Sequence, residues 1–343
     1  MTGSARLPAV GRIGSTVAST VIVLGALACG SSPAAEPRRW STAPPLPVAR
    51  FEAYAAVAHG KVHFIGGITG VIEDLQTARP SQRVDVFDPA SNAWSPGPEL
   101  PADAPKHHLT VAIANDAIYV LGGFDGIIGQ RAGEPFRPIA VAYVLEGAGW
   151  RKLAPPPLAR GGATAQAIEG RIYVTGGAPN EGEPSFDELD VYDIASDRWT
   201  QGARMPTARE HLASCAIAGK LIAVGGWKDH DRTAQAAVES YDPTTDRWTP
   251  LPPLPTPRGG LAAVATGSAC HVIGGEDWAL PFPGTFDEHE TFDVTRGLWT
   301  IDAPMPTARH GLGLAWLGGT LYAIGGGPSQ GNSYTVVVES LAP

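Results

Sequence analysis

The chain has 343 residues, a net charge of −9 at neutral pH, 42 glycines and 32 prolines. An acidic balance of this kind argues against nucleic acid and anionic membranes as partners. Glycine and proline at this level would indicate low complexity if they were scattered, but here they recur at matched places and therefore mark the turns of a repeated fold.

The first 28 residues have the layout of a secretory signal peptide. They carry Arg6 and Arg12, no acidic residue, and an apolar run from about 16 to 28 that is too short to span a bilayer. Positions 26–28 read Ala-Leu-Ala, a cleavage signal, and Cys29 with the following Gly-Ser-Ser resembles a bacterial lipoprotein box. We expect a signal peptide at 1–28, a linker at 29–39, export to the periplasm or an outer-membrane anchor, and lipid attachment at Cys29.

From residue 40 onward one unit of 49 to 56 residues is repeated six times. Each unit contains a Gly-Gly pair that lies sixteen residues after a basic residue. The pairs begin at Gly66, Gly122, Gly176, Gly225, Gly274 and Gly325. The basic residues are Arg50, Lys106, Arg160, Arg209, Arg258 and Arg309. An offset kept six times means that one supersecondary unit is used six times.

Each unit contains four short strand-like segments. In the fourth unit we expect strands at 209–218, 221–224, 237–241 and 248–251, with a turn from Asp242 to Arg247 before the last one. The same Asp precedes a tryptophan by six residues in four units, in the pairs Asp88 and Trp94, Asp193 and Trp199, Asp242 and Trp248, and Asp293 and Trp299. The Asp can set the turn through its own downstream backbone, and the Trp offers apolar area to the next unit.

This pattern resembles the kelch repeat over residues 40–341. The resemblance is carried by the strand that ends in Gly-Gly, by Val-Glu-Ser-Tyr-Asp-Pro at 238–243, by Trp248, and by the Pro-x-x-Arg that opens most units. Unit two departs most, because Val144 stands where the turn Asp is expected. The resemblance implies an all-β fold, a six-bladed β-propeller in which each unit is a four-stranded blade around a central channel.

The two ends of the repeat region complement each other. The last unit ends at Glu339-Ser340-Leu341 without a tryptophan strand, whereas Trp40 stands unclaimed before the first unit. We therefore predict that the N-terminal strand completes the sixth blade, so that the propeller spans 40–343 and leaves no open sheet edge between its first and last blades.

An antiparallel blade places the repeated basic residues, the Gly-Gly pairs and the long loops that follow them on one face. Candidate ligand-binding residues on this face are Arg50, Lys106, His108, Arg160, Arg209, His211, Arg258, Arg309, His310, Trp227 and Trp278. The basic residues could ring the channel mouth and hold a carboxylate. Alternatively, each could be structural and bond its own blade's carbonyls or the acids Asp85, Asp190, Glu239, Glu290 and Glu339.

The sequence lacks the common motifs of catalysis and metal binding. The sequence contains no phosphate loop, zinc spacing or nucleophile elbow, so we assign no cofactor and no metal. The acidic segments 229–231 and 287–290 could hold a divalent ion, but each is short and single, so they are interpreted as solvated loops. Cys215 and Cys270 lie in different units, and we interpret them as buried small side chains, although a disulfide is possible in an oxidising compartment.

Three functions remain, and one of them, a structural or assembly component of the cell envelope, differs from the others only in having no small ligand. The first is a non-catalytic binding module that recognises an anionic protein, peptide or glycan, with no nucleic-acid partner and with membrane contact only through a lipid at Cys29. The alternative is a mutarotase or epimerase that acts on a carboxylate sugar such as sialic acid, an activity also found among exported six-bladed kelch proteins. There, Arg50, Arg209 and Arg309 would anchor the sugar, and Glu52, Glu210 or His211 would move the proton.

Overall fold

The fold is given by a computed structural model of the chain. It describes residues 1, 3, 39–71, 74–126, 136–180, 183–228, 232–278 and 284–342. The expected signal peptide, the linker up to residue 38, Cys29 and the acidic segment 229–231 lie outside the described residues. The chain divides after Pro37, and the unit that begins at Arg38 is the one described below.

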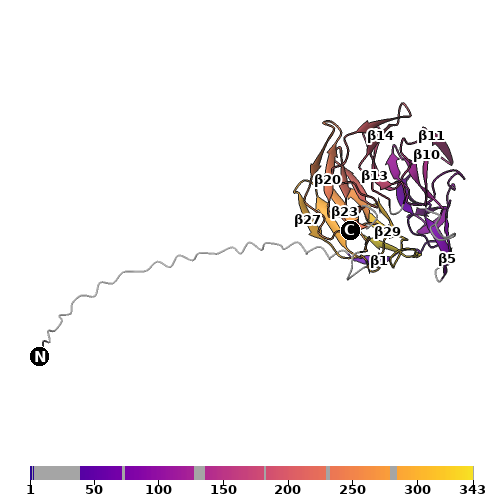
Figure 1. The fold of residues 1–343 in the computed structure, drawn as a ribbon. Helices are drawn as coiled ribbons and strands as arrows, with labels where there is room; N and C mark the ends of the chain where they lie inside the picture. Colours follow the sequence, from indigo (N-terminus) through magenta and orange to yellow (C-terminus); the bar gives the residue numbers. More distant parts are fainter. Residues whose placement is uncertain are drawn as a thin grey trace, which may run out of the picture. The chain divides into compact units, whose positions relative to one another are not determined.

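This unit is all-β and contains no helix in its described residues. It has six four-stranded antiparallel sheets, the blades of a six-bladed β-propeller (Figure 1). The innermost strands of neighbouring blades contact each other around the channel; they are β2 (Tyr54–Ala58), β8 (Val111–Ala114), β12 (Gly161–Ile168), β16 (Ala213–Ile217), β22 (Ala262–Thr266) and β28 (Gly313–Leu317).

The remaining strands follow in order from the channel outward. The second strands are β3 (Lys61–Ile65), β9 (Ala117–Asp125), β13 (Arg171–Ala178), β17 (Lys220–Val224), β23 (Ala269–Ile273) and β29 (Thr320–Ile324). The third strands are β6 (Val84–Asp88), β10 (Arg137–Glu146), β14 (Leu189–Asp193), β20 (Val238–Asp242), β26 (His289–Asp293) and β30 (Val338–Leu341). The outer strands are β7 (Ala93–Pro96), β11 (Gly149–Leu153), β15 (Arg198–Gly202), β21 (Arg247–Pro250), β27 (Leu298–Ile301) and β1 (Trp40–Thr42).

Three of the long loops between second and third strands form small two-stranded sheets of their own. They pair β4 (Ile68–Val71) with β5 (Asp74–Pro80), β18 (Trp227–Lys228) with β19 (Thr233–Ala234), and β24 (Glu276–Asp277) with β25 (Gly284–Thr285). These hairpins continue directly from the Gly-Gly pairs, so they extend the blades on the face that carries the repeated basic residues.

The chain's first strand lies in the last blade. β1 lies at the edge of the last blade, next to the C-terminal end of the propeller (Figure 1). It pairs with β30, and Trp40 stands opposite Leu341. The indole of Trp40 donates to the carbonyl of Ala303, in the segment between β27 and β28. This last blade therefore takes its outer strand from the other end of the propeller sequence.

The outer-strand tryptophans join neighbouring blades. Each indole N–H donates to a backbone carbonyl in the segment before its own blade, as Trp248 does to Ala203 at 2.7 Å and Trp199 to Ala154 at 3.0 Å. Trp94, Trp150 and Trp299 do the same to Pro44, Pro98 and Pro252. A tryptophan suits this place because its ring packs on apolar neighbours while its single N–H finds an acceptor.

The turn aspartates act as their spacing predicts. Asp88, Asp242 and Asp293 each accept a hydrogen bond from the backbone N–H two residues on, at 2.9 Å. Asp193 accepts from the backbone of Ser196. The second blade lacks this aspartate, yet Trp150 keeps its bond to the preceding blade. The turn residue is therefore dispensable for the fold, whereas the inter-blade contact is kept.

The inner strands carry many alanines, which leave an open channel. A cavity of about 190 Å³ is lined by all six inner strands, with Ala55, Ala163, Ala213 and Ala262 among its walls. No helix in the described part of the chain is long and apolar enough to cross a membrane.

Candidate functional site

Five of the six repeated basic residues lie inside their blades. The side chains of Arg50, Arg160, Arg209, Arg258 and Arg309 are at most 2% exposed, and each is paired with an acid of the third strand. Arg50 binds Asp85 at 2.5 Å and also donates to the carbonyl of Gly66, sixteen residues on. Burial lowers the pKa of Arg50 to about 10, so its guanidinium still stays charged at neutral pH.

This burial corrects the prediction of a basic ring at the channel mouth. The guanidinium groups are directed into the sheets, where Arg160 pairs with Asp190, Arg209 with Glu239, Arg258 with Glu290, and Arg309 with Glu339. These acids are the partners named in the alternative prediction, in which the arginines have a structural role. Since a buried cation needs a carboxylate and carbonyl oxygens around it, the repeated arginines hold each blade together, and their burial keeps them from an incoming carboxylate.

Lys106 is the exception. Its ammonium group lies 3.1 Å from the carboxylate of Asp125 and also contacts the carbonyls of Ala102 and Ala104. The second blade therefore replaces the buried arginine pair with a shallower lysine pair, and Asp125 is shared with the exposed Arg137.

A ring of backbone hydrogen bonds surrounds the propeller axis just beyond the arginines. In every blade the residue two places after the repeated basic residue donates its N–H to the carbonyl of its counterpart in the preceding blade, at 2.8–3.2 Å. We call these residues the axial ring: Glu52, His108, Gly162, His211, Gly260 and Gly311. The ring closes on itself, because Glu52 donates to Gly311.

All six members of the axial ring have left-handed backbones. Their φ angles are 48–64°, which glycine adopts freely and which a residue with a Cβ adopts at a cost of about 1–2 kcal/mol. Three blades have glycine at this position, whereas the other three have Glu52, His108 and His211. Non-glycine residues held in this conformation cluster at functional sites, so these three are candidates for a role beyond packing.

Replacing His211 by glycine should therefore leave the protein about 1 kcal/mol more stable than replacing it by alanine, because alanine keeps the Cβ in the left-handed conformation. Urea unfolding of the two variants measures this difference. The matched control is Ser214 in the extended strand β16, where alanine should be the more stable replacement. An alanine variant at 211 that equals or exceeds the glycine variant in stability would contradict the strain argument.

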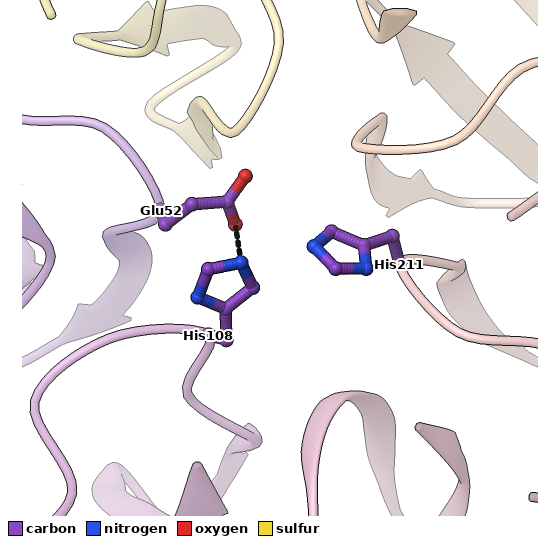
Figure 2. Close-up of side chains that lie close together, drawn as sticks. All are labelled: Glu52, His108 and His211. Atoms are coloured by element: carbon purple, nitrogen blue, oxygen red, sulfur yellow. Dashed lines mark ion pairs between the residues drawn. The ribbon is translucent and has the colours of Figure 1, made fainter. Parts of the chain in front are cut away.

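The three side chains of the axial ring meet at the axis. Figure 2 shows the carboxylate of Glu52 facing His108, with the ring of His211 directed toward both from the opposite side. Glu52 Oε2 lies 3.6 Å from His108 Nε2. The glycines make room for them, because a Cβ at Gly311 would lie 2.4 Å from Glu52 Oε1 and one at Gly162 would lie 3.2 Å from His211 Nδ1.

A small pocket at the mouth lies over this group. Its volume is about 40 Å³, and it is lined by Glu52, His108, His211, Glu276 and His310 together with Arg232 and the aromatic rings of Phe51, Phe136, Trp227 and Trp278. His310 Nδ1 lies 3.2 Å from Glu276 Oε1 and 3.7 Å from Glu52 Oε1. The ionisable walls come from five different blades, so the pocket exists only when the propeller is closed.

Burial and neighbouring charges separate the two pocket carboxylates. Burial alone would raise the pKa of Glu52, but His108, His310 and His211 outweigh it and hold that pKa well below its usual range. For Glu276, burial prevails over the attraction of His310 and raises the pKa. Two carboxyl groups displaced in opposite directions can serve as base and acid within one site.

The pocket imidazoles also differ from each other. Burial lowers the pKa of His108 well below its ordinary value despite Glu52. Burial acts the same way on His310, but Glu276 and Glu52 outweigh it and raise the pKa. The pKa of His211 is raised because Glu210 likewise outweighs burial. The pocket therefore contains one imidazole that favours the neutral form, His108, and two that favour the protonated form, His211 and His310.

The structure brings together five of the residues that the sequence singled out, His108, His211, His310, Trp227 and Trp278, around one pocket. Their role in binding stays a prediction. Sequence reasoning missed Arg232, whose guanidinium carbon lies 4.5 Å from the ring centroid of Trp278, and it missed the inward place of Glu276. Glu276 could have been found, since it is the one charged residue that directly follows a Gly-Gly pair.

A second group of ligand-type side chains lies in the fifth blade, where His271, His289 and Asp302 come together. His271 Nδ1 is 2.9 Å from His289 Nε2. The acidic segment 287–290 is thus split between two sites, because His289 joins this group while Glu290 pairs with Arg258.

The two cysteines form a bond between blades. Cys215 in β16 and Cys270 in β23 are joined by a disulfide, and both are almost fully buried. The interpretation of two separate small side chains was therefore wrong. Their different places in the repeat hid the pairing, because the inner strand of blade four lies against the second strand of blade five.

Comparisons with known proteins agree with this architecture. Residues 100–275 and 149–327 match the KLHDC2/KLHL20/DRC7 kelch-repeats domain family. Human "Kelch repeat and BTB domain-containing protein 12" is 31% identical over 159 residues, which are 43% of this chain and 25% of that protein. "Kelch-like protein terF" of Aspergillus terreus is 27% identical over 140 residues, which are 40% of this chain and 30% of that protein.

The chain thus spans about a quarter to a third of the length of these curated relatives. Among solved structures, the one titled "Structure of YjhT" superposes with a TM-score of 0.71 at 16% identity, and the match covers 87% of this chain and 96% of that one. This likeness concerns the fold.

Proposed function

Because the chain belongs to the kelch-repeat family, whose propeller domains generally mediate protein binding, we propose that it is a binding module that recognises a basic segment of a protein or peptide at its channel mouth. The observation that carries this proposal is the pocket itself. Ionisable side chains from five blades converge there on a space of about 40 Å³. Such a space fits the tip of one side chain and is far below the 300–1,000 Å³ typical of small-molecule sites.

The charge of the mouth determines the kind of partner. The repeated arginines are neutralised inside the blades, which removes the basis for the anionic partner expected from the sequence. Glu52 and Glu276 line the pocket, and Glu210 lies 3.6 Å from His211 behind it. Positive charge comes from Arg232 and from the imidazoles of His211 and His310, whose pKa values are raised mainly by these acids. On a chain with a net charge of −9, this arrangement favours the approach of a lysine or arginine side chain.

Selection from a displayed random peptide library tests the proposal. We expect the enriched peptides to share a lysine or arginine and to bind Glu276→Gln at least tenfold more weakly than the wild type, because this change removes a buried carboxylate partner. Glu99→Gln, which alters an exposed acid outside the pocket, should bind as the wild type does. Peptides without a shared basic residue, or equal affinity for Glu276→Gln, would refute the proposal.

A second candidate function is the isomerase acting on a carboxylate sugar such as sialic acid. One observation favours it, the opposite pKa displacement of Glu52 and Glu276, which supplies a base and an acid. The anchors assigned from sequence are buried in ion pairs, so Arg232 would have to hold the carboxylate. NMR exchange of sialic acid anomers tests this: a rate above buffer that is lost in Glu52→Gln supports the isomerase, and a rate equal to buffer retires it.

We further propose that the chain is exported, as its first 28 residues suggest. The disulfide between Cys215 and Cys270 supports this proposal, because such bonds persist in oxidising compartments. Lipid attachment at Cys29 stays part of the same proposal.

A further inference from the structure

The side chains of the axial ring form a cluster of metal-ligand type, whose role is independent of peptide binding. Its three residues other than glycine offer two imidazoles and one carboxylate, and their ligand atoms all lie within 4.8 Å of one another. Sequence reasoning assigned no metal ligand here, because the three positions are 56 and 103 residues apart and show no metal-binding spacing. They become neighbours only around the closed ring.

Hydrogen bonds fix the tautomer of His108. The carbonyl of Gly126 can only accept, so His107 Nε2, which lies 2.7 Å away, carries a proton. Nδ1 of a neutral His107 is then an acceptor for the Nδ1–H of His108, at 2.6 Å. The remaining nitrogen of His108, Nε2, therefore presents a lone pair toward Glu52 Oε2 at 3.6 Å.

A lone pair and a carboxylate oxygen facing each other in a buried site repel unless a proton or a metal ion lies between them. His211 is also about 5% exposed. Its Nδ1 lies 3.6 Å from the carboxylate of the buried Glu210, which leaves Nε2 as its ligand atom for an ion at the axis. A metal-ligating imidazole usually donates the N–H of its other nitrogen to a neighbouring acceptor, and the Nδ1–H of His108 has such an acceptor in His107 Nδ1.

Backbone conformation gives a further, separate argument. Gly162, Gly260 and Gly311 show that the ring closes without side chains at these positions. The left-handed conformation at Glu52, His108 and His211 costs about 1–2 kcal/mol each, and this strain places all three side chains toward one point at the axis (Figure 2).

We propose that Glu52, His108 and His211 bind one divalent transition-metal ion of the Zn²⁺ or Fe²⁺ class at the propeller axis. Two imidazoles and a carboxylate are a ligand set that such ions take, with positions left open for water or a ligand. Donors bound to one ion at about 2.1 Å lie at most about 4.2 Å apart, so binding would draw these atoms together by roughly half an ångström. The open positions would face the mouth pocket.

Metal uptake by the purified chain tests the proposal, with Co²⁺ and Zn²⁺ as the probes. We expect the wild type to hold one equivalent of Co²⁺, seen by its visible absorption, and one equivalent of Zn²⁺ after dialysis, seen by elemental analysis. Glu52→Gln and His211→Gly should each weaken binding at least tenfold. Glycine occupies this position in three other blades, so His211→Gly should fold. Its thermal midpoint without metal checks that it does.

His271→Ala is the matched control. It alters the second group of ligand-type side chains, formed by His271, His289 and Asp302, and should leave the stoichiometry at one. The proposal is overturned if the wild type takes up neither ion, if His211→Gly binds as tightly as the wild type, or if His271→Ala abolishes binding. Peptide recognition at the mouth could fail while metal uptake succeeds, and the reverse, so the two proposals are tested separately.

Discussion

Replacing Arg209 by alanine should lower the free energy of unfolding by about 3–5 kcal/mol. The guanidinium is fully buried, binds Glu239 at 2.6 Å and donates to the carbonyl of Ala223 at 3.2 Å. Alanine leaves the Glu239 carboxylate almost fully buried with the hydroxyl of Thr207 as its remaining partner. An uncompensated buried charge is far more costly than the loss of the pair's own attraction. Denaturant unfolding of the two proteins measures the difference.

Arg204→Ala is the control for that experiment. Arg204 also pairs with two acids, Asp187 at 2.7 Å and Glu188 at 2.9 Å, but it is 66% exposed, so its removal should change stability by no more than about 1 kcal/mol. If Arg209→Ala were as stable as Arg204→Ala and instead lost a ligand, the arginines would be binding residues after all. Joint replacement of Arg209 and Glu239 by apolar residues should recover much of the loss, because no buried charge is then left alone.

Removal of the disulfide should lower the free energy of unfolding by a similar amount. The bond joins residues 55 positions apart, and the chain-entropy relation gives about 4 kcal/mol for a loop of that length. The double variant Cys215→Ala/Cys270→Ala should therefore unfold at clearly lower denaturant concentration than the wild type. Double replacement avoids a free thiol and the side reactions of a reductant.

Cys29→Ala is the cysteine-matched control and should leave the unfolding curve unchanged, because Cys29 precedes the propeller unit. Blades four and five should also lose protection from hydrogen exchange first in the double variant, since the bond joins β16 to β23. An unfolding free energy equal to that of the wild type would show that the link does not restrain the unfolded chain.

The disulfide and the arginine pairs act on different contacts. Each arginine pair holds the strands of one blade together, as Arg309 and Glu339 do in the last blade. The disulfide and the tryptophan indoles join one blade to the next. Both changes nevertheless affect blade four, where Cys215 stands opposite Ile222 and Arg209 donates to the neighbouring Ala223, so a combined variant measures how strongly the two contacts are coupled.

The sequence by itself determined the repeated unit and its turns. The sixteen-residue offset from Arg209 to Gly225 is the length of two strands and the turn between them. A local distance of this kind can be read directly from the spacing of residues in the sequence. The same holds for the hydrogen bond of Asp242 within its own turn. Even the acids that pair with the arginines could be named, because they stand at one fixed place in the third strand.

The tertiary structure alone decided where these charges point. Whether Arg209 faces the channel mouth or the interior of its blade depends on packing and solvent, which no spacing records. The gathering of Glu52, His108 and His211 and the bond between Cys215 and Cys270 likewise need blades that the sequence separates by about fifty residues or more. Closure of the ring creates these contacts, because only then do equivalent positions of different blades meet at one axis.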